Sequence, residues 1–498
     1  MKKQQRRQRK KQKHGFLIKA LLILAALIVV AVVVFFYQDY QSDKVAYLIN
    51  LSEFNLRAAS SKDAKLVGKT EIGKIYKLNE ELTGEQHSFS NKWYELNLED
   101  GKTAYLIDSP VRQIKLSKKE KKLLEEASTP ENLARIKSEL KDFPKEYQEA
   151  LVYIKLLEPA WDFTAYKVEE SFPEVLKAEL ASEDTNLVQY EDSEYFRPYK
   201  WMLKNRTVYD GNNWYPVNEE ALSYFLDTRN FLDRQGLFQF LDLRYEDKKS
   251  DAAVKAIFSG NEGLLDIVPQ LMQASLETKY LPEAFASRIK QEVSKGDDIT
   301  YVAKGMIDPE QKPLVDGAPS PGYLSAEEQI EQLESLSSLS SEQEKVLNNL
   351  KAGKSGYKQP KNKYFNFLNI GAYPDPGQAM GAQVNAALYA KGEFEDEASQ
   401  RYKDLHLPWT DKESAIFGAA YLISHDYLAQ GQVNPYLQKF DLVSGDYEHQ
   451  YMQAVNGSRA EGNRLYKSWT ASGSSWAGLN FLIPVFKDMP EIAVIDRG

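Results

Sequence analysis

The sequence predicts a multidomain protein with a single transmembrane helix, a small β-barrel, and then a mainly α-helical module that carries a helical insertion. Three observations lead to this prediction. A basic tail precedes an apolar run, short alternating segments follow that run, and helical periodicity dominates the rest of the chain. With 498 residues the chain is long enough for two or more domains, since domains usually contain about 100 to 200 residues.

The N-terminal segment predicts a membrane anchor. Residues 1–15 form a basic tail without acids, and residues 16–37 form an apolar run whose last 18 residues are uncharged. At 1.5 Å per residue, such a helix crosses a hydrocarbon core of about 30 Å. The positive-inside rule keeps the tail in the cytoplasm, so we expect a single-pass type II protein of the cell membrane with its later domains outside.

A cleaved signal peptide is the alternative interpretation of this segment. The apolar run is longer than a usual signal-peptide core, and Val32–Gln38 offers no small-x-small cleavage site. We therefore expect the cytoplasmic membrane to be a permanent partner of the chain, with a membrane protein as a possible further partner.

Composition excludes several classes of function. The chain has no cysteine, which rules out disulfides, thiolate nucleophiles and cysteine-bound metals. Its five histidines show no HExxH or other close ligand spacing, so we expect no metal and no cofactor. Beyond residue 19 the sequence holds 54 basic against 72 acidic side chains, which argues against nucleic acid as a partner.

Residues 45–115 predict the small β-barrel, because short alternating segments are separated by turn residues. The wording of this stretch resembles a bacterial SH3 domain, in segments Leu51–Arg57, Gly73–Tyr76, Lys92–Leu96 and Asp100–Tyr105. The resemblance implies a module that binds cell-wall peptides, with Trp93 and Tyr105 as candidate ligand contacts. Both aromatics could instead belong to the core or rim of a spacer domain.

Residues 116–142 predict a charged helical linker with two helix starts. Ser117–Glu120 has the spacing of a capping box, and Thr129–Pro130 places a capping residue before a first-turn proline. Few apolar residues are available for burial here, so we expect a spacer between the barrel and the next module.

One acid on an apolar stripe marks the candidate catalytic helix. If Leu281–Val293 is helical, then Leu281, Phe285, Ile289 and Glu292 share one face. Burial lifts the pKa of a carboxyl group toward neutrality, which a general acid requires. The alternative is an ordinary acid at a helix end that turns to solvent or pairs with Arg288.

A second acid, Glu277, competes for this role. On a helix from Leu264, the apolar face contains Leu264, Val268 and Leu271, whereas Glu277 lies about 140° or more from most of that face. We therefore expect Glu277 to face solvent.

An insertion at about residues 297–357 predicts two short helices that pack as a hairpin. Ser325–Glu328 and Ser341–Glu344 have the spacing of capping boxes. Leucines in the first helix can pack against Val346, Leu347 and Leu350 in the second. The insertion could form a lid or a docking surface, or it could be a decorative loop.

Ordered motifs between residues 143 and 490 resemble a group of Firmicute cell-wall N-acetylglucosaminidases of glycoside hydrolase family 73, with a leader at 143–260. The motifs are Phe143–Tyr147, Pro159–Tyr166, Tyr209–Trp214, Glu220–Leu232, Phe238–Leu243, Ala286–Val293, Tyr364–Tyr373, Ala415–Ser424, Tyr427–Gln432, Tyr436–Phe440, His449–Met452 and Phe481–Phe486. The resemblance implies a lysozyme-like helical fold. Ser294 stands where these relatives usually carry glycine, and Lys279 replaces the glycine of a competing Leu-Glu-Thr-Gly motif.

The resemblance also implies a reaction and a set of site residues. It predicts cleavage of the β-1,4 bond after N-acetylglucosamine in peptidoglycan glycan strands, with Glu292 as general acid and Tyr451 as a second catalytic group. The expected substrate-binding residues are Gln291, Tyr364, Phe365, Asn369, Tyr373 and Tyr427. Glycosidases usually need a second carboxylate, and no second acid is equally marked, so the 2-acetamido group of the sugar is the alternative nucleophile.

The sequence leaves two further functions open. A catalytically silent scaffold could keep the fold and bind the wall, and a muramidase or lytic transglycosylase could share the helical fold. Asp297 and Asp298 are close to Glu292 in sequence, but both could be solvated.

Overall fold

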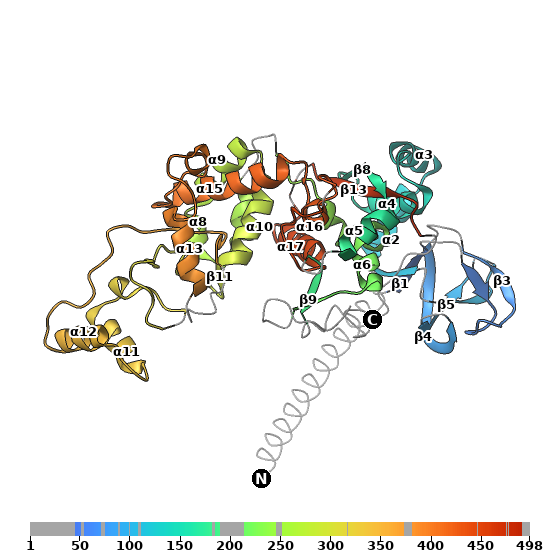
Figure 1. Cartoon of the computed structure of the whole chain (residues 1–498). Helices are drawn as coiled ribbons and strands as arrows, with labels where there is room; N and C mark the ends of the chain where they lie inside the picture. Colours follow the sequence, from blue (N-terminus) through green and yellow to red (C-terminus); the bar gives the residue numbers. More distant parts are fainter. Residues whose placement is uncertain are drawn as a thin grey trace, which may run out of the picture. The chain divides into compact units, whose positions relative to one another are not determined.

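The computed structural model describes residues 45–50, 54–70, 75–87, 90–98, 100–107, 111–181, 185–189, 214–245, 251–315, 317–372, 381–445, 447–474, 476 and 478–490. These residues fall into two compact units, one ending at Pro159 and one running from Ala160 to Pro490 (Figure 1). The predicted basic tail, the predicted transmembrane helix and Tyr373 lie outside the described residues. Within the described residues, no helix has the length and apolar character needed to span a membrane.

The first unit contains an antiparallel sheet with strand order β3-β2-β6-β5-β4-β1-β7. Its strands are β1 (Val45–Asn50), β2 (Asn55–Arg57), β3 (Leu66–Lys69), β4 (Ile75–His87), β5 (Ser90–Asn97), β6 (Thr103–Ile107) and β7 (Val111–Leu116). Alternate residues of neighbouring strands form one apolar core that includes Leu56, Leu78, Leu96 and Leu106. Strands therefore occur where the alternation predicted them, and the resemblance to an SH3 domain stays a prediction.

The two aromatic candidates in this sheet occupy different environments. Trp93 is 1% exposed and its indole N–H donates to the carbonyl of Glu85 at 2.9 Å. Tyr105 is partly buried, and its hydroxyl donates to the carboxylate of Glu95 at 2.9 Å. Trp93 is thus a core residue of the sheet, which leaves Tyr105 as the more accessible of the two.

Helices α2 (Lys118–Ala127), α3 (Pro130–Glu139) and α4 (Lys145–Leu157) complete the first unit. Ser117 and Glu120 form the predicted capping box, and Thr129 caps α3 ahead of its first-turn proline. Both α2 and α3 pack against α4, where Ile136 is buried. The charged segment therefore packs on a neighbouring helix, because each of its short helices supplies a few apolar side chains at helical spacing.

The second unit joins its beginning and its end through a parallel strand pair. Strand β8 (Asp162–Ser171) pairs with β13 (Asn480–Lys487), with Phe163 opposite Phe481. Trp161, Phe238 and Trp469 gather beside this pair with ring centroids 4.9 to 5.7 Å apart from one another or from Phe481. This aromatic cluster ties the strand pair to the helices that carry the site.

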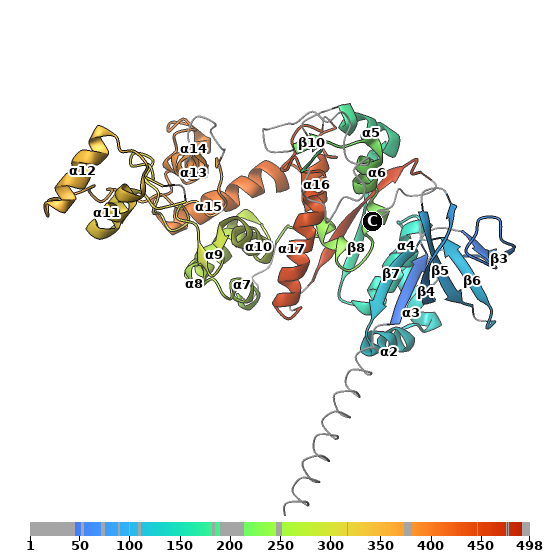
Figure 2. The same ribbon diagram turned by 90° about the horizontal axis from the view of Figure 1, so that it is seen from below.

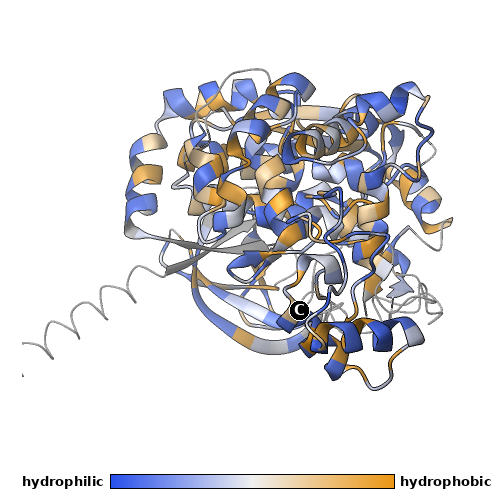
Figure 3. Ribbon diagram, turned by 90° about the vertical axis from the view of Figure 1, so that its left-hand side faces the viewer, coloured by the Kyte–Doolittle hydropathy of each residue, from blue (hydrophilic) through white to orange (hydrophobic). Residues whose placement is uncertain are grey.

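The remaining elements of the second unit are mainly helical. They are α5 (Phe172–Ala181), β9 (Leu187–Gln189), β10 (Trp214–Pro216), α6 (Glu219–Leu226), η2 (Thr228–Phe231), η3 (Gly236–Phe240), α7 (Ala252–Ile257), α8 (Glu262–Leu265), α9 (Val268–Thr278), α10 (Pro282–Val293), β11 (Ser294–Lys295), β12 (Asp298–Ile299), η4 (Pro321–Tyr323), α11 (Ala326–Ser335), α12 (Ser341–Lys351), α13 (Gly381–Lys391), α14 (Gln400–Asp404), α15 (Lys412–Ile423), η5 (Ser424–Leu428), α16 (Pro435–Phe440) and α17 (Gly457–Ala471). Hydrophilic and hydrophobic positions alternate along these helices, as expected where one face is buried (Figure 3).

Helix α17 packs closely against the segment η3 because Gly462 has no side chain. A Cβ atom at Gly462 would lie 2.5 Å from the backbone nitrogen of Gln239, closer than real Cβ contacts. Helix α17 also contacts α10, which lies beside it in Figure 2. The candidate site lies on this pair of helices.

The predicted single helix from Leu264 is divided in the structure. Helix α8 ends at Leu265 and α9 begins at Val268, with Pro269 in its first turn. The first turn of a helix tolerates proline but the interior does not, which explains why the chain starts a new helix before Pro269. Glu277 is exposed, as the helical periodicity predicted.

The insertion forms the expected helical hairpin of α11 and α12. Ser325 caps α11 in the predicted box with Glu328. The predicted start of α12 was wrong by one residue: Ser340 is the capping residue, and its hydroxyl accepts from the backbone N–H of Gln343. Two adjacent serines can both cap a helix, and the extended backbone of Ser340 selects the first.

Candidate active site

Glu292 lies in the last turn of α10 and is half-buried. The helix ends at Val293, because Ser294 leaves the helix with an extended backbone and pairs with Ile299. Gly296 then provides the turn between β11 and β12 at φ +64°. Ser294 has φ −71°, which any residue can adopt, so the exchange of glycine for serine causes no backbone strain here.

Asn369, which belongs to the motif at residues 364–373, contacts the C-terminal end of α10. Its side-chain amide donates to the backbone carbonyl of Glu292 at 2.5 Å. The backbone of Asn369 is left-handed at φ +50°, a conformation that asparagine tolerates. The buried Asn366 fixes this turn, since its amide group bonds the carbonyls of Ile370 and Ala386 and accepts from the N–H of Ile370.

Arg288, one turn before Glu292 on α10, is almost completely buried and pairs with Glu461 on α17. Its Nε donates to Glu461 Oε1 at 2.9 Å, and one terminal nitrogen contacts the same oxygen and Gln438 Oε1 at 3.2 Å. The alternative in which Arg288 neutralises Glu292 is therefore not the arrangement observed: the arginine bonds the carboxylate of another helix.

The ring of Tyr451 contacts the guanidinium group of Arg288. The guanidinium carbon lies 4.4 Å from the centroid of the Tyr451 ring, in a cation–π contact. Tyr427 meets Tyr451 edge-on at 5.1 Å between ring centroids. The predicted residues Tyr427 and Tyr451 thus lie together on the Arg288 side of the site.

The pKa of Glu292 is raised above its ordinary value. Burial is the largest cause, and the negative charge of Glu461 raises the pKa further, while Arg288, Arg464 and the hydrogen bond of Asn369 act in the opposite direction. Burial likewise raises the pKa of the Tyr451 hydroxyl. A raised pKa increases the protonated fraction of a carboxyl at any given pH, and the protonated form is the one that can deliver a proton to a leaving group.

The other predicted substrate-binding residues differ in how accessible they are to a ligand. Gln291 is exposed, and its amide lies 3.4 Å from Glu292 Oε1. Tyr364 and Phe365 are 7% and 8% exposed, and Phe365 stacks on Phe367. These two rings present little surface to a ligand, so the geometry gives their predicted binding role no support.

The acids near Glu292 are either exposed or already paired, so none is clearly placed as a second catalytic carboxylate. Asp297 and Asp298 are exposed in the β11–β12 hairpin, and Asp298 pairs with Lys304 at 2.5 Å. Glu461 is buried and occupied by Arg288. Within the described residues no group of three or more His, Cys, Asp or Glu side chains could hold a metal ion.

Sequence reasoning missed Glu461, Arg464 and Gln438. Helical periodicity contains a signal for Glu461, because Ser458, Glu461 and Leu465 share a buried stripe of α17 in the same way that Glu292 shares one on α10. Gln438 follows no comparable pattern, and its role depends on the contact between α16 and α17.

Comparisons with known proteins find no matching family model and no matching curated protein. Among solved structures, glucosaminidase B of S. aureus aligns with 66% of this chain and 96% of its own at 16% identity and a TM-score of 0.41. A major bifunctional autolysin aligns with 65% of this chain and 98% of its own at 15% identity and a TM-score of 0.39. A catalytic mutant of S. aureus autolysin E in complex with the disaccharide NAG-NAM aligns with 64% of this chain and 98% of its own, at 14% identity and a TM-score of 0.35. At these values the likeness establishes neither the family nor the activity of this chain.

Proposed function

We propose that the chain is a membrane-anchored peptidoglycan hydrolase that cleaves the β-1,4 bond after N-acetylglucosamine. The observation that carries this proposal is Glu292, a half-buried carboxyl with a raised pKa whose nearest arginine on its own helix is bonded to another acid. The sequence motifs that resemble cell-wall glucosaminidases give the reaction class and the bond.

Glu292 acts as the general acid in this proposal. It transfers its proton to the glycosidic oxygen as the bond from that oxygen to C1 breaks, and a water molecule finally adds to C1. Glu461 is a poor candidate for nucleophile or base, since Arg288 occupies it in a buried pair. This favours the 2-acetamido oxygen of the sugar as the group that attacks C1, with the Tyr451 hydroxyl orienting it.

The N-terminal sequence supports the proposed location. The basic tail and the apolar run of residues 16–37 anchor the chain in the cell membrane, and the catalytic module acts outside on glycan strands near the outer leaflet. Replacing the chain with residues 38–498 fused to a cleavable signal peptide tests this: the truncated protein should leave the membrane fraction and appear in the medium. Retention in the membrane fraction would contradict the anchor.

The reaction is tested by digesting purified peptidoglycan and identifying the new ends by mass spectrometry. The full chain should release fragments with reducing N-acetylglucosamine, and Glu292→Gln should release none above background. Glu277→Gln is the matched control, because Glu277 is an exposed acid on the preceding helix. New N-acetylmuramic or anhydro ends would assign another activity, and binding without release by the wild type would support a scaffold.

A further inference from the structure

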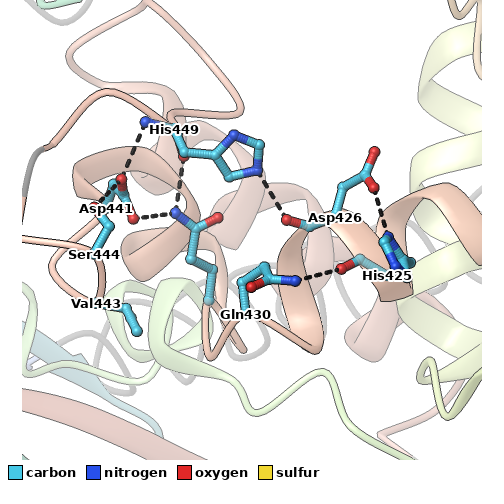
Figure 4. A pocket seen from close by; sticks show the side chains of 8 residues that line it. His425, Asp426, Gln430, Asp441, Val443, Ser444 and His449 are labelled. Carbon is cyan, nitrogen blue, oxygen red and sulfur yellow. Dashed lines mark hydrogen bonds and ion pairs between the residues drawn. The ribbon is translucent and has the colours of Figure 1, made fainter.

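A pocket lies beside the candidate active site, around the helical segment η5, and most of the residues that line it are polar. Its volume is about 500 Å³, and Figure 4 shows His449 and Asp441 on one side with His425 and Gln430 on the other. The lining residues are His425, Asp426, Gln430, Gln432, Asp441, Val443, Ser444 and His449. Segment η5 is a π-helix, in which the N–H of Ala429 donates to the carbonyl of Ser424 at 2.7 Å. Such segments are frequent at functional sites.

Gln432 supplies the observation that points to a ligand. It is 1% exposed, and its amide nitrogen contacts two groups that can only accept, the carboxylate of Asp441 and the backbone carbonyl of His449. These contacts fix the orientation of the amide, so its oxygen Oε1 is the atom left over. That oxygen is buried and has no hydrogen-bond partner among the described residues. A buried acceptor of this kind requires a donor from a ligand or water.

The two histidines add acceptors to the same pocket. His449 Nε2 lies 2.8 Å from the carbonyl of Asp426, so this nitrogen carries the hydrogen. His425 Nδ1 lies 2.9 Å from the Asp426 carboxylate, so this nitrogen is also the donor. In the neutral rings the opposite nitrogens, Nδ1 of His449 and Nε2 of His425, are therefore acceptors.

The charge of the pocket favours a cation. Two carboxylates line it, those of Asp426 and Asp441, and no lining residue in the described part of the chain is Lys or Arg. Arg401 binds Asp426 with both terminal nitrogens at 2.9 and 3.0 Å. Asp441 accepts from Gln432, from the Ser444 hydroxyl at 2.6 Å and from the N–H of His449 at 3.0 Å, without any cationic partner among these donors.

The backbone is arranged to hold this carboxylate in place. Asp441 is 1% exposed and has a left-handed conformation at φ +41° at the end of α16. Aspartate adopts this conformation more readily than most residues, and the donors from Gln432, Ser444 and His449 hold its carboxylate in one orientation. The pocket is thus a built site with a fixed acid and an unpaired acceptor.

We propose that this pocket binds a primary ammonium group carried by the peptide part of the peptidoglycan substrate. An ammonium group donates three hydrogen bonds and carries the charge that two carboxylates and one arginine leave uncompensated. The inference rests on the proposed function, because it makes the pocket a specificity site for strands with uncapped amines. The pocket reaches the reacting centre through aromatic contacts: His449 stacks on Tyr427 at 4.8 Å, and Tyr427 meets Tyr451.

The test compares native peptidoglycan with peptidoglycan whose free amines have been acetylated with acetic anhydride. The KM of the full chain should rise about tenfold or more on acetylated material, because a hydrogen bond to a charged group contributes about 1.5 kcal/mol or more. Val443, 37% exposed at the pocket, is the position for variants. Val443→Lys fills the pocket with its own ammonium group and should remove the difference between the two substrates. Val443→Gln, of similar length without charge, should keep the difference.

Controls separate this inference from the proposed reaction. Val315→Lys places the same charge on a valine that is equally exposed, outside the pocket, and should keep the tenfold difference. Equal KM values on both substrates for the wild type overturn the inference while the reaction stands. If Val443→Lys raises the KM by the same factor on native and on acetylated peptidoglycan, the inference is also overturned, because glycan hydroxyl groups would then occupy the pocket.

A binding experiment tests the pocket even if no bond is cleaved. Saturation-transfer NMR with the detergent-solubilised full chain should detect Nα-acetyl-lysine amide and should give no signal with its Nε-acetyl derivative. Val443→Lys should lose the signal and Val443→Gln should keep it. Absence of the signal in the wild type overturns the inference without reference to enzymatic activity.

Discussion

Arg288 and Glu461 form a buried ion pair, and its removal should follow a non-additive pattern. The side chains are 1% and 8% exposed, so either partner left alone becomes an uncompensated buried charge. Removing one partner of such a pair costs about 3–5 kcal/mol, whereas replacing both by apolar groups is often neutral or stabilising. Arg288→Met and Glu461→Leu should each lose about this much, and the double variant should lose less than either single variant. The coupling energy is then about 3 kcal/mol or more.

The assay is urea unfolding of the detergent-solubilised full chain, with the free energy of unfolding of the second unit followed for wild type, both single variants and the double variant. Arg464 carries a positive charge near Glu461, so Arg288→Met should fall at the lower end of the range. If the losses of the two single variants simply add up in the double variant, the ion pair contributes no coupling and the described arrangement of charge is wrong.

Three further predictions concern the residues around the acid. Glu292→Gln should raise the free energy of unfolding at pH 7, by about 1.4 kcal/mol for each unit by which folding raises the pKa of Glu292. This gain should vanish below pH 4, because the carboxyl is then protonated in the unfolded chain as well, where its pKa is about 4.3. Urea titrations at both pH values measure the difference. A gain that is equal at both pH values would contradict the raised pKa. Asn369→Gly, which keeps φ +50° and loses the bond to Glu292, should lower kcat/KM about tenfold with little change in thermal stability; unchanged kinetics would remove Asn369 from the site. Tyr451→Phe keeps the ring contacts and should lower kcat about 100-fold with little change in KM, whereas an unchanged kcat would limit Tyr451 to packing.

Local features of the sequence were sufficient to predict the helix that carries Glu292 and the starts of two other helices. The stripe of Phe285, Ile289 and Glu292 predicted α10, since one helix face must be buried. The capping boxes at Ser117 and Ser325 predicted two helix starts, because a capping side chain bonds a backbone N–H only three residues ahead.

Long-range partners of the acid were beyond such reasoning. Arg288 and Glu461 are 173 residues apart, and their contact depends on the packing of α17 against η3 and α10. The π-helix at Ser424–Leu428 also leaves no periodic pattern, since an extra residue per turn is visible only in backbone hydrogen bonds. Whether Arg288 pairs with Glu292 or with another acid is therefore a property of the tertiary structure.

That choice of partner decides what Glu292 can do. Arg288 lies four residues before Glu292 on one helix, a spacing at which the two side chains can pair and the pKa of the acid falls. Instead, two nitrogens of Arg288 donate hydrogen bonds to the carboxylate of Glu461 on α17, in a buried ion pair. The positive charge beside Glu292 is thereby compensated, and burial of Glu292 in the last turn of α10, where the helix dipole also disfavours a negative charge, becomes the dominant influence on its pKa. Glu461 is thus a positioning residue: it leaves Glu292 as an acid that can hold a proton until a leaving group needs it.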